Sequence, residues 1–360
     1  MQFQGSELRL ARVFNGYSLD EVGERVEKTR QYLHKCETGQ TTPSDELIVN
    51  LANTLRVRPE FFFVGTRCVT SEDQFHFRKL FTTKAMVKQV AMARGEMFGR
   101  LAAHLDSALK LPRVFIPDFG LARTADEIER AADSCRREWA LGMGPIADMN
   151  RLAEHIGVLV TSFQSLSKEV DALSVATSRP IIVRNEAKES VCRQRFDIGH
   201  ELGHLVLHAG VATGDRQTES QANRFASALL IPQSMMLKLF PKPRNGRLDW
   251  QALSEFKLTW KASKAAILYR ARQLGLLTED QYRTGAITLR RTGEAQGERE
   301  DFKIPYEGPE LLMTSFEVLS KRKNVTSDMI AAALNVLPSF LEELAGVKAS
   351  RSERPSLRLV

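Results

Sequence analysis

The chain lacks the features that mark secreted, disulfide-bonded and membrane-spanning proteins. Its 360 residues include only four cysteines, which are scattered and form no C-x-x-C pair. That spacing argues against a disulfide framework and a cysteine-based metal site, and it fits a reducing compartment. No apolar run reaches the roughly 18 residues that a transmembrane helix needs, and the polar start Met-Gln-Phe-Gln-Gly is not typical of a signal peptide. We therefore expect a soluble cytoplasmic protein with no membrane partner.

Histidine is also scarce, with seven in the whole chain, yet three of them lie within nine residues. The stretch His200-Glu201-Leu202-Gly203-His204 has the form H-E-x-x-H inside a run that reads as helix. Positions i and i+4 share a helix face, so the two imidazoles can point at one ion. Glu201 lies beside them, where its carboxylate can accept a proton from water, as a zinc hydrolase requires. The alternative is a helix that merely carries two histidines.

The identity of a third ligand decides between these readings. His208 continues the series, but a rise of about 1.5 Å per residue places it about 12 Å along the helix axis from His200. Zinc–nitrogen bonds are only about 2 Å long, so we expect His208 to end the helix, where the macrodipole favours it when protonated.

Glu219 is the other candidate ligand, in a second helix that we expect Thr218 to cap and Pro232 to stop. The polar loop 209–217 is long enough to bring that helix back beside the first. Glu219 then either faces the imidazoles as a ligand or is only an acidic residue at a helix N-terminus, where acids are favoured. Asn223, one turn later, either supports a ligand or has a structural role.

The motif His-Glu-Leu-Gly-His-x-x-x-His, followed by Glu-x-x-Ala-Asn-x-Phe-Ala-x-x-Leu-Leu-x-Pro, resembles the ImmA/IrrE family of zinc metallopeptidases. The resemblance extends over roughly residues 120 to 290 and is most specific in these two helices. It implies a zincin-like domain with a small sheet and a Zn²⁺ cofactor. It also implies that Glu201 is the general base and that the metal ligands are His200, His204 and Glu219. No oxyanion donor follows from the motif, and the candidates are Arg193, Arg195, Tyr269 and Arg270.

Residues 6 to 63 read as a compact set of short helices. Ser18-Leu19-Asp20-Glu21 has the form of a capping box, Thr29 can cap a helix from Arg30 to Lys35, and Pro43-Ser44 begins another. Two short helices joined by a tight turn follow the helix-turn-helix plan, and the segment resembles an Xre/Cro-type DNA-binding domain. That resemblance makes the third helix the recognition helix. Its expected DNA contacts are Lys28, Thr29, Arg30, Gln31 and Lys35.

Charge neither proves nor excludes DNA binding. The formal net charge of +7 and the pI near 9.3 permit contact with nucleic acid. Residues 1–70, however, hold nine Lys and Arg against nine Asp and Glu. Binding would then depend on segregation, with Lys28, Arg30 and Lys35 on one side of the module and the acids of residues 20–24 on another. A partner-binding or dimerisation role is the alternative.

The sequence thus predicts an α+β, mostly helical protein built from several parts. An all-α helix-turn-helix domain occupies residues 1–66, and a connecting helix and linker span 67–119. A peptidase-like domain covers 120–290, with short strands at 158–163 and 180–183 and a poorer one near 173–177. Residues 290–303 are charged and glycine-containing and read as a linker, 304–347 as a small helical region, and 348–360 as a disordered tail.

Two functions fit this organisation. The first is a transcriptional regulator that binds a double-stranded operator and acts as a zinc endopeptidase. Its substrate would be another regulator, a Cro-like repressor whose cleavage releases genes from repression. The second is a non-proteolytic repressor or antitoxin whose peptidase-like domain binds a partner protein, such as a cognate toxin. The resemblance to Xre-type regulators also allows a homodimer.

Overall fold

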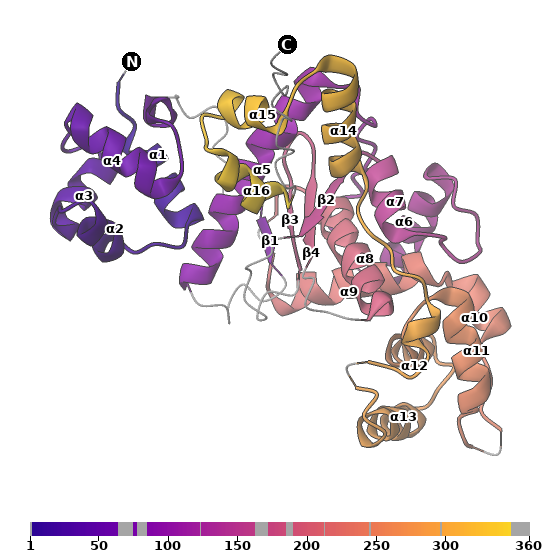
Figure 1. Cartoon of the computed structure of the whole chain (residues 1–360). Helices are drawn as coiled ribbons and strands as arrows, with labels where there is room; N and C mark the ends of the chain where they lie inside the picture. Colours follow the sequence, from indigo (N-terminus) through magenta and orange to yellow (C-terminus); the bar gives the residue numbers. More distant parts are fainter. Residues whose placement is uncertain are drawn as a thin grey trace, which may run out of the picture.

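The computed structural model describes residues 2–63, 75–77, 85–122, 124–162, 172–184, 190–211, 213–244, 246–295 and 297–346, with the backbone alone at 75–77, 85, 172 and 173. Helices dominate the described residues, and a small four-stranded sheet lies at the centre of the view in Figure 1. The predicted α+β, mostly helical class is therefore confirmed. Within the described ranges, no helix combines the length and the apolar character that crossing a bilayer requires.

Four short helices form the N-terminal domain, and the last three begin at the predicted capping residues. They are α1 (Gly5–Phe14), α2 (Leu19–Arg25), α3 (Arg30–Glu37) and α4 (Asp45–Leu55), followed by a 3-10 turn at Pro59–Phe63. Ser18 and Glu21 make both bonds of the capping box, and the Thr29 and Ser44 side chains accept the Tyr32 and Leu47 amides. These bonds satisfy backbone donors that a helix start would leave free, so short helices are stabilised.

The sheet contains β1 (Phe75–Phe77), β2 (Leu159–Ser162), β3 (Ala172–Val175) and β4 (Ile181–Arg184) in the order β1-β3-β4-β2. Strands β2 and β4 are parallel, whereas β3 runs antiparallel to both β4 and β1. The last three strands lie where apolar runs predict them. Strand β1 comes from the segment after the N-terminal helices, and we predicted no strand there.

The two faces of the sheet belong to two different hydrophobic cores. Leu159, Ile181 and Val183 pack with α5 (Ala85–Ala108), α14 (Leu311–Lys323) and the N-terminal helices. Val160 and Ile182, which follow Leu159 and Ile181 in the sequence, pack on the opposite face with α7 (Met149–His155) and α8 (Val191–Leu207). Side chains along a strand alternate between the two faces of the sheet. The sheet therefore lies between the two cores and contributes side chains to both.

Six further helices belong to the second core. They are α6 (Ala125–Glu138), α9 (Arg216–Leu230), α10 (Gln233–Leu239), α11 (Trp250–Trp260), α12 (Lys264–Gln273) and α13 (Glu279–Arg291). Helices α10 to α13 form the orange group at the lower right of Figure 1. Each of the six helices contributes buried apolar residues to the second core, to which Ile198, Leu202 and Val206 of α8 also belong.

The linker predicted at 290–303 is wrong. Helix α13 continues to Arg291, and a 3-10 turn forms at Asp301–Lys303. Two buried lysines hold this stretch in place. Lys257 Nζ lies 2.6 Å from Glu298 and also contacts Asp301, while Lys264 pairs with Glu294. A buried ammonium group requires a carboxylate partner. The acids of this stretch, which suggested a solvated linker, therefore fix it to the two lysines.

The C-terminal helices α15 (Ser327–Ala333) and α16 (Pro338–Ala345) return to the N-terminal domain. Phe340 of α16 stacks on Phe14 of α1 with ring centroids 3.7 Å apart. The Glu343 carboxylate lies 2.5 Å from both Arg56 and Arg94. These contacts place the helix-turn-helix domain and the C-terminal region in one core; residues 348–360, the predicted tail, lie outside the described residues.

Replacing Phe340 by alanine tests this shared core. Phe340 is fully buried, so Phe340→Ala should lower the free energy of unfolding by about 3–5 kcal/mol in a chemical denaturation experiment. Phe302→Ala is the matched control, because Phe302 is 83% exposed and its loss should change stability by less than about 0.5 kcal/mol. Equal effects of the two substitutions would contradict the packing of α16 on α1.

Candidate metal centre

Helices α8 and α9 approach each other closely because small residues line their contact. A Cβ atom added at Gly203 would lie 3.1 Å from the Phe225 ring and 3.2 Å from the Ala222 backbone. A Cβ at Gly199 would lie 3.3 Å from the Ala226 side chain. These distances are tighter than ordinary contacts, so glycine at both positions lets the two backbones come together. The approach carries the first turn of α9 to the histidine face of α8.

The ligand atoms of His200, His204 and Glu219 converge at this point. The two Nε2 atoms lie 3.0 Å apart, and each lies 3.3 Å from a different oxygen of the Glu219 carboxylate. Both histidines are fully buried, whereas the Glu219 side chain keeps 16% of its exposure. Among the described residues these three form the group that is close enough to hold a metal ion.

The group matches the requirements of a zinc ion in its ligand types and its spacing. Two imidazole nitrogens and one carboxylate are a common ligand set of catalytic zinc, with a fourth position left open. At bond lengths of about 2.0–2.1 Å, tetrahedral geometry places ligand atoms about 3.3 Å apart. The His–Glu spacing observed here is therefore compatible with one bound ion.

The start of α9 differs from the prediction. Asp215, not Thr218, is the N-cap, and its carboxylate accepts the backbone N–H groups of Gln217 and Thr218. Thr218 lies inside the first turn and donates its hydroxyl to Asp215. Aspartate and threonine both cap helices well, so local sequence did not decide between them. The earlier start still leaves Glu219 in the first turn.

Asn223 orients the first imidazole. Its Oδ1 atom lies 3.0 Å from His200 Nδ1. An amide oxygen only accepts hydrogen bonds, so Nδ1 carries the proton and Nε2 presents a lone pair toward Glu219 and the second histidine. Of the two roles considered for Asn223, the structure thus favours support of a ligand.

A hydrogen-bond relay orients the second imidazole. The Gln221 amide donates to the Ala122 carbonyl at 2.7 Å, so its oxygen faces His208 Nε2 at 2.9 Å. His208 therefore holds its proton on Nε2 and accepts at Nδ1, which lies 3.0 Å from His204 Nδ1. His204 must donate that hydrogen bond. Its Nε2 atom is then left unprotonated, as metal binding requires.

His208 takes part in this relay, although sequence analysis treated it only as a helix end. It is indeed the C-cap of α8. It is fully buried, however, and burial lowers its pKa, opposed by the hydrogen bond to Gln221. Because desolvation disfavours the charged form, the macrodipole benefit expected of a protonated His208 does not apply to the neutral residue in this relay.

The Glu219 carboxylate is ionised. Burial raises its pKa, but the two imidazoles that face it lower the pKa to about 2 when they carry protons on Nε2, the positions that a bound cation would occupy instead. A negative charge next to two imidazoles is what a divalent cation requires of its ligands.

Glu201 directly follows His200 on α8 and contacts the sheet. Its Oε2 atom accepts a hydrogen bond of 2.6 Å from the hydroxyl of Ser174, and both side chains are fully buried. Ser174 belongs to β3, so this bond ties the carboxylate to the sheet. Ser174 was not among the predicted site residues. A single hydroxyl in an otherwise apolar strand was the available signal, but its partner depends on strand pairing.

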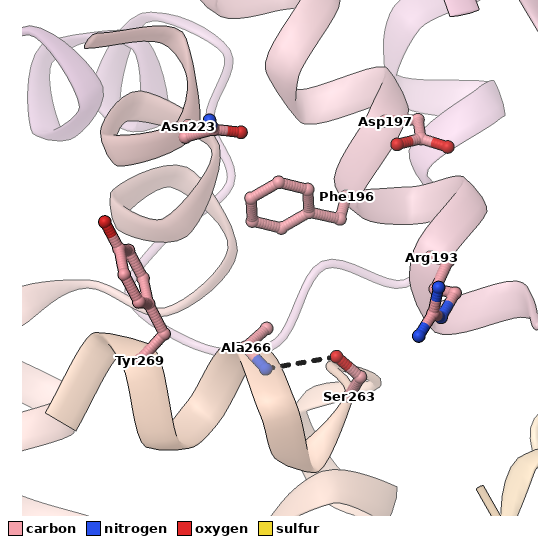
Figure 2. Close-up of a pocket in the computed structure, with 7 residues that line it drawn as sticks. All are labelled: Arg193, Phe196, Asp197, Asn223, Ser263, Ala266 and Tyr269. Carbon is pink, nitrogen blue, oxygen red and sulfur yellow. Dashed lines mark hydrogen bonds between the residues drawn. The ribbon is translucent and has the colours of Figure 1, made fainter. Parts of the chain in front are cut away.

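A pocket of about 280 Å³ adjoins the metal group. Figure 2 shows it between α8, α9 and α12, with the Phe196 ring pointing into it and Tyr269 and Asn223 along one side. Asn223 is also the partner of His200, so the pocket and the metal group share a wall. The other lining residues are Arg193, Asp197, Ser263 and Ala266.

The four candidate oxyanion donors separate into two pairs. Arg195 and Arg270 are buried in ion pairs, the first with Glu307 and the second with Glu129 at 2.5 Å. Their guanidinium groups are therefore engaged in structural contacts. Arg193 and Tyr269 instead line the pocket beside the metal group, although Arg193 also donates to the Ala295 carbonyl.

The predicted DNA-contacting residues lie on one exposed stretch. Lys28 and Thr29 precede α3, and Arg30, Gln31 and Lys35 lie on it, all five exposed. The expected segregation of charge is incomplete, because Arg30 lies 3.3 Å from Asp20 of α2. Both side chains are exposed, so this ion pair contributes at most about 1 kcal/mol and leaves Arg30 available to a phosphate.

Two segments of the chain match known family models. Residues 153–272 match the IrrE N-terminal-like domain of the M78 peptidases, and residues 5–60 match a helix-turn-helix domain. Both resemblances drawn from the motifs are thereby confirmed. The first segment contains β2, β3, β4 and the helices of the metal group, and the second contains α1 to α4. No curated protein was found to match the chain.

Loss of the relay should weaken metal binding. His208→Phe removes the acceptor that holds the proton on His204 Nδ1, so the zinc dissociation constant should rise about 10–100-fold in a chelator competition assay. His155→Phe, at an exposed position on α7, is the matched control and should leave zinc affinity unchanged. A zinc affinity that survives His208→Phe would contradict the relay.

Proposed function

We propose that this chain, which joins a helix-turn-helix domain to an IrrE N-terminal-like domain, is a DNA-binding transcriptional regulator with zinc-dependent endopeptidase activity. The observation that carries the proposal is the convergence of His200, His204 and Glu219 next to a buried carboxylate, Glu201. Three ligands with an adjacent general base are the parts that a metallopeptidase requires.

A zinc ion held by the three ligands would polarise the scissile carbonyl and lower the pKa of a water molecule. Glu201 is the general base, which accepts a proton from that water and delivers it to the leaving nitrogen. The hydrogen bond from Ser174 holds one Glu201 oxygen in place, so proton transfer involves a positioned carboxylate. The pocket beside His200 is large enough to receive a substrate side chain.

The substrate is a protein, and a Cro-like repressor cut at one site best fits the fusion to a DNA-binding domain. The helix-turn-helix domain would bring the peptidase to promoters where such a repressor acts, or bind the protein's own operator. The exposed residues at the start of α3 support operator binding, because that end of a recognition helix enters the major groove.

Glu201→Gln separates proteolysis from binding. Wild-type protein should contain about one zinc per chain by elemental analysis, and Glu201→Gln should keep that metal while cleavage of a co-expressed neighbouring-gene repressor falls at least about 100-fold. Glu219→Ala is the matched comparison, because it should lose both zinc and cleavage. If wild type and Glu201→Gln control gene expression equally, the protein acts instead as a non-proteolytic repressor or antitoxin that binds a partner.

Arg30→Ala tests the DNA-binding surface. Loss of one phosphate contact should weaken operator binding in an electrophoretic mobility assay and reduce the slope of log K against log salt by about 1. Arg322→Ala removes the same charge from an exposed position on α14 and should leave binding unchanged. Identical binding by wild type and Arg30→Ala would refute the assignment of α3 as the recognition helix.

A further inference from the structure

The edge of the sheet next to Glu201 is occupied by the chain's own residues. Strand β3 pairs with β4 on one side and with β1 on the other, so both of its edges are taken. Strand β1 lies far upstream of β3 in sequence, and it falls outside both family matches. Without β1, residues Ala172–Val175 would form a free sheet edge beside the metal-motif helix.

The register places β1 opposite the residue that contacts the general base. Phe75 pairs with Val175, His76 with Ser174 and Phe77 with Leu173, all antiparallel. Ser174 donates its hydroxyl to Glu201, whereas Val175 faces the other core. Strand β1 therefore takes the position in which an extended peptide would run past the candidate catalytic carboxylate.

We infer that this edge of β3 is a docking site for an extended peptide, bound antiparallel through its main chain, and that Phe75–Phe77 is its internal occupant. An extended peptide adds a strand to a free sheet edge by main-chain hydrogen bonds. It pairs with β3 only after β1 has left. For its consequence on cleavage, this inference rests on the proposed peptidase function.

The length of β1 makes such an exchange feasible. A strand of three residues makes only a few ladder hydrogen bonds, and each contributes about 0.5–1.5 kcal/mol net. What favours β1 over a free peptide is its covalent tether, which acts as an effective concentration of about millimolar order. A longer peptide of similar sequence, aromatic on either side of a polar residue, can make more ladder bonds and displace it.

A disulfide that locks β1 onto β3 tests the inference. Phe75 and Val175 are register partners, so cysteines at both positions should cross-link on oxidation. The double variant Phe75→Cys/Val175→Cys is made in a Cys68→Ser background, because the other native cysteines are buried. The probe is a fluorescein-labelled synthetic peptide of residues 71–81, measured by anisotropy on protein stripped of metal with EDTA.

We expect the oxidised double variant to bind the peptide at least 10-fold more weakly than the same protein after reduction. The single variant Phe75→Cys is the control and should show no dependence on oxidation. A double variant that fails to cross-link would overturn the β1–β3 register. Equal peptide affinity before and after reduction would overturn the competition between peptide and β1.

Proline substitutions test the opposite direction. Alternate residues of an antiparallel strand direct their N–H groups to the partner, so His76→Pro and Phe77→Pro are tested separately. At least one should bind the peptide about 10-fold more tightly than wild type, whereas His76→Ala, which keeps the backbone N–H, should not. Wild-type affinity in both proline variants would count against β1 as the occupant.

This readout is independent of the peptidase proposal. Peptide binding is measured without metal and without cleavage, so absence of zinc or proteolysis in the Glu201→Gln experiment would leave the docking site intact. Conversely, the protein could prove to be a zinc peptidase whose peptide affinity is unchanged by the disulfide and by the prolines. The proposed function would then stand, and only the assignment of β1 as the occupant of the edge would be refuted.

Discussion

The close contact of α8 with α9 is the constraint on which the candidate site depends. Glycines at positions 199 and 203 remove the side chains that would hold the helices apart, and alanines at 222 and 226 face them. Because the backbones approach so closely, a carboxylate from the first turn of α9 reaches two imidazoles of α8 at 3.3 Å. One larger side chain in this contact would move a ligand away from the other two, so packing and chemistry share the same residues.

Two branches of hydrogen bonds surround this contact. Asn223 orients His200, while Gln221 and His208 orient His204, each through one hydrogen bond to a ring nitrogen. The chain of bonds ends on a backbone carbonyl at Ala122, whose position is set by the segment before α6. The tautomers of both metal-facing imidazoles are thus determined by residues that do not touch the metal position. Such a network keeps the two nitrogens ready for a cation before one binds.

The small sheet connects this centre to the helix-turn-helix end of the chain. One face packs against the helices that hold the metal group, and the other face packs in the core that contains α1 to α4, α5 and α14 to α16. Strand β1 adds a second connection, since it leads from the helix-turn-helix domain to the strand that touches Glu201.

Features with a local physical cause were determined by the sequence alone. Helix caps at Ser18, Thr29 and Ser44 and the pairing of two histidines on one helix face depend on residues within one or two turns. Tertiary structure decided what depends on distant partners. It made the acids of 294–301 anchors for two buried lysines, gave His208 its neutral relay role, and set Ser174 against Glu201. It also placed residues 75–77 at the sheet edge. Strand pairing and the burial of charge depend on residues far apart in the chain, and no local pattern carries that information.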